Sequence, residues 1–221
     1  MDIMEAMAAR HSVRQYTDRP LSADIIAALN DKIGECNRES GLNIRLITDE
    51  PKAFDCFMAR YGKFSGVRNY IALIGKKGGQ SDEACGYQGE RLALFAQSLG
   101  LNSCWVAMSY RKVPEALKLA SDEKLVVVIA LGYGENQGQP HKSRRAEEVS
   151  DLTADSPEWY RRGVEAALLA PTAMNQQKFQ FSLSGGSVSA KAGGIAYAKV
   201  DLGIAKLHFE LGAGKENFAW Q

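Results

Sequence analysis

The sequence predicts an α+β fold, because helical and extended patterns alternate along the chain. Continuous apolar runs at residues 70–75 and 125–131 are typical of buried strands. Apolar stripes with helical spacing lie before, between and after these runs, and the order helix, strand, loop, helix occurs twice. The 221 residues, 45% of them hydrophobic and 24% charged, suffice for one sizeable core or two small ones.

The composition narrows the classes of function. A formal charge of +1 gives no global field that would recruit nucleic acid or an anionic membrane, so an anion site must be a local cluster of Arg and Lys. The four cysteines form no CxxC motif, which argues against zinc or dithiol chemistry and suits a reducing cytoplasm. No apolar run approaches roughly 18 residues, so we expect no signal peptide, no membrane anchor and a cytoplasmic location.

The first third of the chain is predicted to contain two helices and a strand. Residues 2–9 have apolar side chains at helical spacing and lead into the basic cluster 10–14. Ser22 is a plausible N-cap for a second helix, whose apolar stripe ends near Gly41. Residues 42–47 then alternate like a strand.

The middle of the chain is predicted as strand, helix, strand, helix, strand. The strand at 70–75 is broken at Gly78-Gly79, and a helix follows at about 82–99 with Gly100 just after its end. An extended segment at 102–106 and a short helix at 114–119 precede the strongest strand, 125–131.

The last third begins with a polar stretch at 135–140, and an acidic, polar linker is expected at 147–155. Ser156 as N-cap and Pro157 at the first position predict a helix through residue 169, which Pro171 ends. A strand is predicted at 179–183, a flexible stretch at 184–194, and a final helix at 201–211. This helix resembles the one at 82–99 when Gly203 is aligned with Gly86, but the pattern alone leaves an internal duplication open.

A Gly-x-Gly pair, Gly132 and Gly134, follows the strongest strand. A dinucleotide-binding motif would need a helix to start at these glycines. The residues that follow are polar, are interrupted by Pro140 and have no apolar stripe, so a strand-ending turn is favoured.

Two basic clusters could bind a phosphate group. Arg10 and Arg14 form one, and Lys142 and Arg144 the other. Guanidinium groups grip phosphate with two hydrogen bonds, and Lys adds a point charge, so the two clusters together would hold a phosphomonoester. Each also carries a serine hydroxyl. Taken singly, however, either cluster is more typical of a solvated charged surface.

The segment 170–177, APTAMNQQ, lies between a helix and a strand. Its small residues would let a flat ring approach the backbone. Asn175 and Gln177 offer amide donors and carbonyl acceptors, which match the alternating N–H and C=O groups of a flavin pyrimidine edge. The alternative is an ordinary turn at the end of a helix.

Three segments resemble motifs of the nitroreductase-like flavoproteins. These are ARHSVRQYTDRPL near the start, ACGYQGERLALFAQSLGLNSCWV in the middle, and VVVIALGYG with HKSRRAEEV. They occur in the family's order over nearly all of residues 1–150. The resemblance implies a nitroreductase-like α+β fold with a central, mostly antiparallel sheet flanked by helices, and FMN as cofactor.

One family element is displaced. The A-P-S-A-x-N-x-Q-P-W element usually follows the opening basic motif closely, but here it resembles residues 170–179, with Lys178-Phe179 in place of Pro-Trp. In family homodimers this element reaches the flavin of the other subunit. The chain therefore resembles a fused pseudo-dimer, with residues 1–151 as a first repeat and 152–221 as a second, shorter one, so that a monomer would suffice.

The resemblance also implies a set of flavin contacts. Arg10, Ser12, Arg14, Lys142 and Arg144 would hold the phosphate and ribityl chain, and His11 stands where a second Arg is usual. Lys63 matches only loosely. The other implied contacts are the ring-lining Pro171, Thr172, Ala173, Asn175 and Gln177 and, at the reactive edge, the backbone of Trp105, Val106 and Ala107.

The implied activity is ping-pong transfer of hydride from NAD(P)H through flavin N5 to nitroaromatics, quinones or similar small-molecule acceptors. No side chain is expected to act as acid, base or nucleophile. The alternatives are a relative that acts on halogenated or flavin substrates, and a non-catalytic protein that binds or stores FMN.

Overall fold

The computed structural model describes residues 1–78 and 81–221 and divides the chain into two compact units. Unit 1 comprises residues 1–81 and 91–140, and unit 2 comprises residues 82–90 and 141–221. Each unit is described by itself below. Of the break predicted at Gly78-Gly79, Gly78 has a positive φ of 71°, and Gly79 lies outside the described residues.

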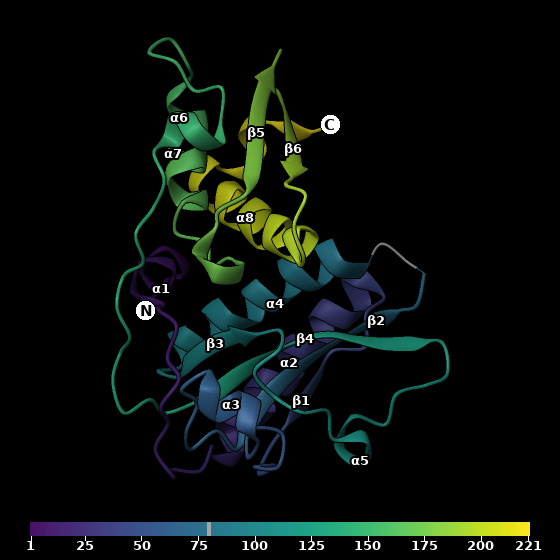
Figure 1. The fold of residues 1–221 in the computed structure, drawn as a ribbon. Coiled ribbons are helices and arrows are strands. Elements are labelled where there is room, and N and C mark those ends of the chain that lie inside the picture. The colour runs from purple at the N-terminus through teal and green to yellow at the C-terminus, as the bar shows by residue number, and fades with distance from the viewer. Residues whose placement is uncertain (79–80) are drawn as a thin grey trace. The chain divides into compact units, whose positions relative to one another are not determined.

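Unit 1 contains a four-stranded antiparallel sheet in the order β1-β2-β4-β3, with bounds Arg45–Ile47, Asn69–Lys76, Glu123–Gly132 and Asn102–Val106 (Figure 1). The two continuous apolar runs of the sequence, 70–75 and 125–131, form the central strands β2 and β4. Every residue of β2 except Lys76 is buried, which explains why this strand shows no alternation. The predicted antiparallel sheet with flanking helices is confirmed.

The helices of unit 1 are α1 (Ile3–Ala9), α2 (Ala23–Ser40), α3 (Phe57–Tyr61), α5 (Pro114–Leu117) and the second half of α4 (Ser81–Ser98). Ser22 caps α2 as predicted, since its side chain accepts the Ile25 N–H, and Gly41 ends the helix at a φ of 69°. The strand predicted at 42–47 starts only at Arg45. The reason is that the N–H groups of Leu42 and Ile44 bond to side chains of α2 instead.

Unit 2 combines helices with a second, three-stranded sheet. Its main helices are the first half of α4, α7 (Glu158–Ala167) and α8 (Ala198–Ala213), and its sheet has the order β5-β6-β7 (Phe179–Ser184, Ser187–Ala192, Ala219–Trp220). Short helices lie at α6 (Ala146–Val149), η1 (Ala173–Asn175) and η2 (Lys215–Asn217). The unit contains a cluster of aromatic side chains, in which the rings of Phe181 and Phe209 stack with their centres 4.8 Å apart.

Three expectations for this part of the chain were wrong. The stretch 184–194, expected to be flexible, forms β6, because Gly185 and Gly186 both have positive φ and make the two-residue turn of a β-hairpin. The linker expected at 147–155 begins inside α6. Ser156 does not cap α7, since its hydroxyl accepts the Thr153 N–H at 2.9 Å and Pro157 holds the cap position.

The first half of α4 crosses α8 with backbone against backbone. A Cβ placed on Gly86 would lie 2.0 Å from the Val200 carbonyl oxygen, and one on Gly203 would lie 2.0 Å from that of Glu83. Each glycine therefore faces the residue three positions before the other glycine. The two helix backbones therefore meet directly at this pair of glycines.

Charged and polar side chains flank the crossing within unit 2. Lys206 pairs with Glu83 at 2.8 Å. The fully buried His208 places Nε2 3.0 Å from a Glu90 carboxylate oxygen and Nδ1 3.2 Å from the Ala166 carbonyl oxygen. Both ring nitrogens thus face oxygen atoms, which fixes the rotation of α8 against α4 and α7.

We predict that Gly203→Ala lowers the free energy of unfolding by about 1–3 kcal/mol or more, because the new methyl group forces α4 and α8 apart. Gly34→Ala, also in a helix, is the matched control. Its Cβ would meet only the flexible end of Arg38 at 3.3 Å, so a gain of roughly 0.5–1 kcal/mol is expected. Urea unfolding of both variants tests this, and equal effects would contradict the close crossing.

Candidate functional site

In unit 1 the first basic cluster lies beside β3, an edge strand of the sheet. Ser12 forms a parallel bridge with Ser103 of β3, and the Val13 N–H donates to the Ser103 carbonyl oxygen at 3.1 Å. The Arg14 carbonyl oxygen accepts the Ser65 N–H at 3.0 Å. The structure therefore places residues 10–14 next to β3, the strand that contains Trp105 and Val106 of the predicted flavin edge and is followed by Ala107.

Positive charge is concentrated at this point. Burial raises the pKa of the Cys104 thiol, and the Arg14 charge, a hydrogen bond with Ser12 and the Arg10 charge oppose the rise. Burial also raises the pKa of the Tyr16 hydroxyl, again against the charges of Arg14 and Arg10. Arg10 is 3% exposed, whereas Arg14 is exposed to solvent. An anion approaching this segment would meet the exposed Arg14, while the Arg10 side chain is buried.

The other predicted residues of unit 1 have varied environments. His11 is half-buried, and its Cβ would lie 2.7 Å from a Cβ placed on Gly138. Lys63 is exposed in a turn with a φ of 62°, and it precedes Phe64, whose ring centre lies 6.0 Å from the Arg14 guanidinium carbon. Val106 is buried between the half-buried Trp105 and Ala107.

In unit 2 the segment 170–177 folds as a loop around the side chain of Gln177. Gln177 is 1% exposed, and its carboxamide oxygen accepts the Arg144 N–H at 2.7 Å. Its amide nitrogen donates to the Leu168 carbonyl oxygen at 2.9 Å. One buried side chain thus joins the second basic cluster to the end of α7.

Further hydrogen bonds hold the second basic cluster on this loop. Asn175 donates from Nδ2 to the Lys142 carbonyl oxygen at 2.8 Å, and Arg144 donates from Nε to the Gln176 carbonyl oxygen at 3.0 Å. Ser143 donates from its hydroxyl to Leu168. The two predicted motifs are separated by about thirty residues in sequence, and the structure brings them together.

The loop has a strained backbone. Met174, Asn175 and Gln177 all have positive φ, at 53°, 53° and 47°. Left-handed backbone is unfavourable for residues other than glycine, and such residues cluster at binding and active sites. Met174 is also 89% exposed, while its neighbours bond inward. This combination supports a ligand-binding role for the loop rather than an ordinary turn.

Asp201 is a site residue that the sequence analysis missed. It is 4% exposed in the first turn of α8, and both carboxylate oxygens accept the Ala173 N–H, at 3.0 and 3.1 Å. Burial raises the pKa of this carboxyl from its usual 3.8 to about 6, although the Ala173 hydrogen bond opposes the rise. An acidic residue among apolar neighbours at the start of a helix was the available signal.

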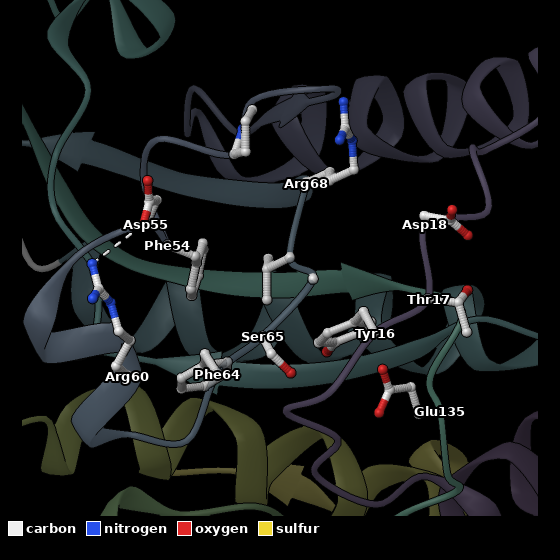
Figure 2. A pocket seen from close by; sticks show the side chains of 13 residues that line it. Tyr16, Thr17, Asp18, Phe54, Asp55, Arg60, Phe64, Ser65, Arg68 and Glu135 are labelled. Atoms are coloured by element: carbon white, nitrogen blue, oxygen red, sulfur yellow. Dashed lines mark hydrogen bonds and ion pairs between the residues drawn. The ribbon is translucent and has the colours of Figure 1, made fainter.

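One hollow of unit 1 is not lined by any of the predicted ligand residues. It has a volume of about 730 Å³, and the rings of Tyr16, Phe54 and Phe64 are among the side chains that line it (Figure 2). Arg60 pairs with Asp55 at 3.5 Å, and Arg68 pairs with Asp49. Because both arginines already face acids, we assign this hollow no part in the candidate site.

Two searches of the described residues bear on other kinds of site. Residues 1–78 and 81–221 contain no group of three His, Cys, Asp or Glu side chains placed to hold a metal ion. No helix in the same ranges is both long and apolar enough to cross a membrane.

Comparison with known proteins identifies the family. The family described as "Putative TM nitroreductase" matches residues 2–213. The chain belongs to this family. The resemblance drawn from the basic motifs and the APTAMNQQ segment is thereby confirmed at the level of the family. A search of curated proteins found no match.

Solved structures agree with the nitroreductase fold. A putative nitroreductase from Thermotoga maritima is 25% identical, with a TM-score of 0.67 over 98% of this chain and 85% of that one. A putative nitroreductase in complex with FMN from Desulfovibrio desulfuricans is 19% identical (TM-score 0.53, 71% of this chain, 99% of that one). A nitroreductase family protein from Streptococcus pneumoniae is 13% identical (TM-score 0.54, 67% and 98%).

We predict a pH-dependent cost from Asp201. Its folded-state pKa of about 6 lies above the unfolded value, so stability from this group is full below pH 4 and is lost as the pH rises through 6. Relative to Asp201→Asn, the parent nitroreductase should lose on the order of 3 kcal/mol between pH 4 and pH 7. Urea unfolding at both pH values measures this difference, and parallel pH profiles for the two proteins would refute it.

Proposed function

We propose that the protein is an FMN-dependent oxidoreductase that transfers hydride from NAD(P)H to nitroaromatics, quinones or similar small acceptors. The observation that carries the proposal is the joining of residues 142–144 to the strained loop 171–177 through Gln177 and Asn175. Family membership supports it, as does the FMN named for the Desulfovibrio protein of the same fold. The free cysteines suit the reducing cytoplasm that we expect.

The donor set of the loop region fits this cofactor. Lys142 and Arg144 carry charge for a phosphate group, as do Arg10 and Arg14, with Ser12 as a neutral donor. Asn175 uses Nδ2 on the Lys142 carbonyl, which leaves its Oδ1 as an acceptor for a ring N–H. The Gln177 side chain is fully engaged and the residue is 1% exposed, so we assign Gln177 the role of holding the loop in shape. Pro171, Thr172 and Ala173 would form the ring wall together with Asn175.

The chain's residues have a positioning role in this proposal. Bound FMN would supply the hydride-accepting centre, N5 of its ring. The protein fixes the loop through Asp201 and Gln177 so that its polar groups are preorganised, and it holds the cofactor phosphate by charge. No side chain needs to transfer a proton as acid or base.

We also propose that the chain is a fused pseudo-dimer with repeats at 1–151 and 152–221. The reciprocal contacts of Gly86 and Gly203 support this, because a two-fold axis relates equivalent helices in that way. The coverage of the solved structures supports it as well. The Desulfovibrio and Streptococcus proteins fit almost whole onto 71% and 67% of this chain, so a further segment remains.

The first test is spectroscopic. The purified protein should be yellow, should release FMN rather than FAD on denaturation, and should oxidise NADH or NADPH faster when a quinone or nitroaromatic is added. Protein that holds FMN without steady-state turnover would support the storage alternative. Colourless protein that also fails to bind added FMN would reject the flavin proposal.

Loss of a phosphate-binding arginine should weaken FMN. We expect Arg14→Ala and Arg144→Ala each to reduce FMN affinity by about 2–3 kcal/mol, the scale of a lost charge-assisted hydrogen bond. Arg145→Ala is the matched control, because this neighbouring guanidinium pairs with Glu148 at 3.4 Å. Fluorescence titration measures the affinity for FMN. Equal affinity in all three variants would mean that Arg14 and Arg144 are solvated surface residues that do not bind the phosphate.

The pseudo-dimer proposal predicts one FMN per chain. Residues 152–221 contain no counterpart of RHSVR or KSRR, so a second complete set of ligand residues is lacking. Flavin absorbance after denaturation, divided by protein concentration, should give a ratio near one. A ratio near two would rule out the single composite site.

A further inference from the structure

A second hollow in unit 1 is surrounded by cations. Its volume is about 330 Å³, and it is lined by Lys52, Arg111, Lys112, Val113, Pro114 and Glu115. All three cationic residues are exposed, and Glu115 is the one acid in the lining. Three positive charges around a small concave space form a site for an anionic group.

The three cations are not neutralised by the chain itself. Across residues 1–78 and 81–221, neither lysine ammonium group pairs with a carboxylate, and the Arg111 side chain bonds only to the Lys52 carbonyl oxygen, from Nε at 2.9 Å. The Arg111 N–H also donates to the Ala53 carbonyl oxygen at 2.8 Å. These two bonds fix the segment 108–112 against residues 52–53 and leave the outer guanidinium nitrogens available.

Large apolar side chains lie exposed on α3 and on the segment 108–112. Phe57 and Tyr61, four residues apart on one face of α3, are each 77% exposed, and Met108 is 67% exposed. A Cβ placed on Gly62 would lie 2.7 Å from the Ser109 side chain. The loop that contains Met108 and Ser109 therefore runs beside the end of α3. Aromatic rings in this state favour stacking with a flat ring from a ligand.

From these features we infer a binding site for a phosphomonoester that carries a purine ring, the adenosine 2′-phosphate end of NADPH. The inference rests on the proposed function, and it makes NADPH the preferred reductant over NADH. Lys52, Arg111 and Lys112 bind the 2′-phosphate, and Phe57 or Tyr61 stacks on adenine. Lys112 follows the predicted flavin-edge residue Ala107 by five positions, a span of at most about 18 Å.

The binding test uses adenosine 2′,5′-bisphosphate, adenosine 5′-monophosphate and inorganic phosphate as calorimetric probes of the full chain. The bisphosphate should bind at least tenfold more tightly than either other probe. Lys52→Ala/Lys112→Ala should weaken the bisphosphate by about tenfold to a hundredfold, on the scale of two lost charge contacts. Arg111 is left in place because it holds the Lys52 backbone.

Two further variants separate charge from stacking. Lys191→Ala/Lys199→Ala removes the same charge from exposed positions of unit 2 and should leave bisphosphate binding within twofold of the parent. Phe57→Ala/Tyr61→Ala should weaken the bisphosphate but not inorganic phosphate. Equal weakening by both lysine pairs, or no change in the aromatic variant, would overturn the site.

Kinetics distinguish this inference from the proposed function. The Lys52/Lys112 variant should raise KM for NADPH at least tenfold, with KM for NADH and FMN content unchanged. Equal use of NADH and NADPH by flavin-loaded parent protein would refute the inference and leave the function intact. If the protein binds the bisphosphate at Lys52 and Lys112 but holds no flavin, the anion site is supported and the proposed flavin-dependent function is refuted.

Discussion

The close crossing of α4 and α8 is the constraint on which the architecture of unit 2 depends. The helices meet at Gly86 and Gly203, where no side chain separates their backbones, so their spacing allows little adjustment. His208 and Lys206 then fix the rotation of α8 through Glu90 and Glu83. The start of α8 is thereby held in place, and this segment carries Asp201.

Asp201 contacts the loop at residues 170–177 directly, so the fixed position of α8 also fixes this loop. Its carboxylate binds the Ala173 N–H, Gln177 bonds through its own N–H to the Thr172 hydroxyl, and the Gln177 carboxamide holds the Arg144 backbone. Each of these polar groups is satisfied inside the protein, so the network is rigid despite its strained backbone. Burying Asp201 and placing Met174 in a left-handed conformation both cost stability, which is typical of residues retained for a site rather than for the fold.

The elements governed by local pattern could be predicted from the sequence. Ser22, Gly41 and Gly100 mark helix ends by rules that involve a few neighbouring residues, and the apolar runs of β2 and β4 leave little choice but a buried strand. The hairpin at Gly185-Gly186 also has a local signal, two adjacent glycines between alternating residues, but its Ser- and Ala-rich strands have a composition that is typical of a flexible stretch. The loss of Ser156 as a cap depended on one competing bond, to Thr153.

The assembly of the candidate site could not be predicted in the same way, because its contacts are long-range. The sequence showed that Arg144 and Gln177 have suitable chemistry, yet nothing in the pattern shows that the Gln177 carboxamide is already occupied by the Arg144 and Leu168 backbones. The second basic cluster follows β4 along the chain but belongs to the compact unit that contains the loop. Lys142 and Arg144 therefore take their places only when residues 168–177 have folded, so the second basic cluster and the loop form as one element.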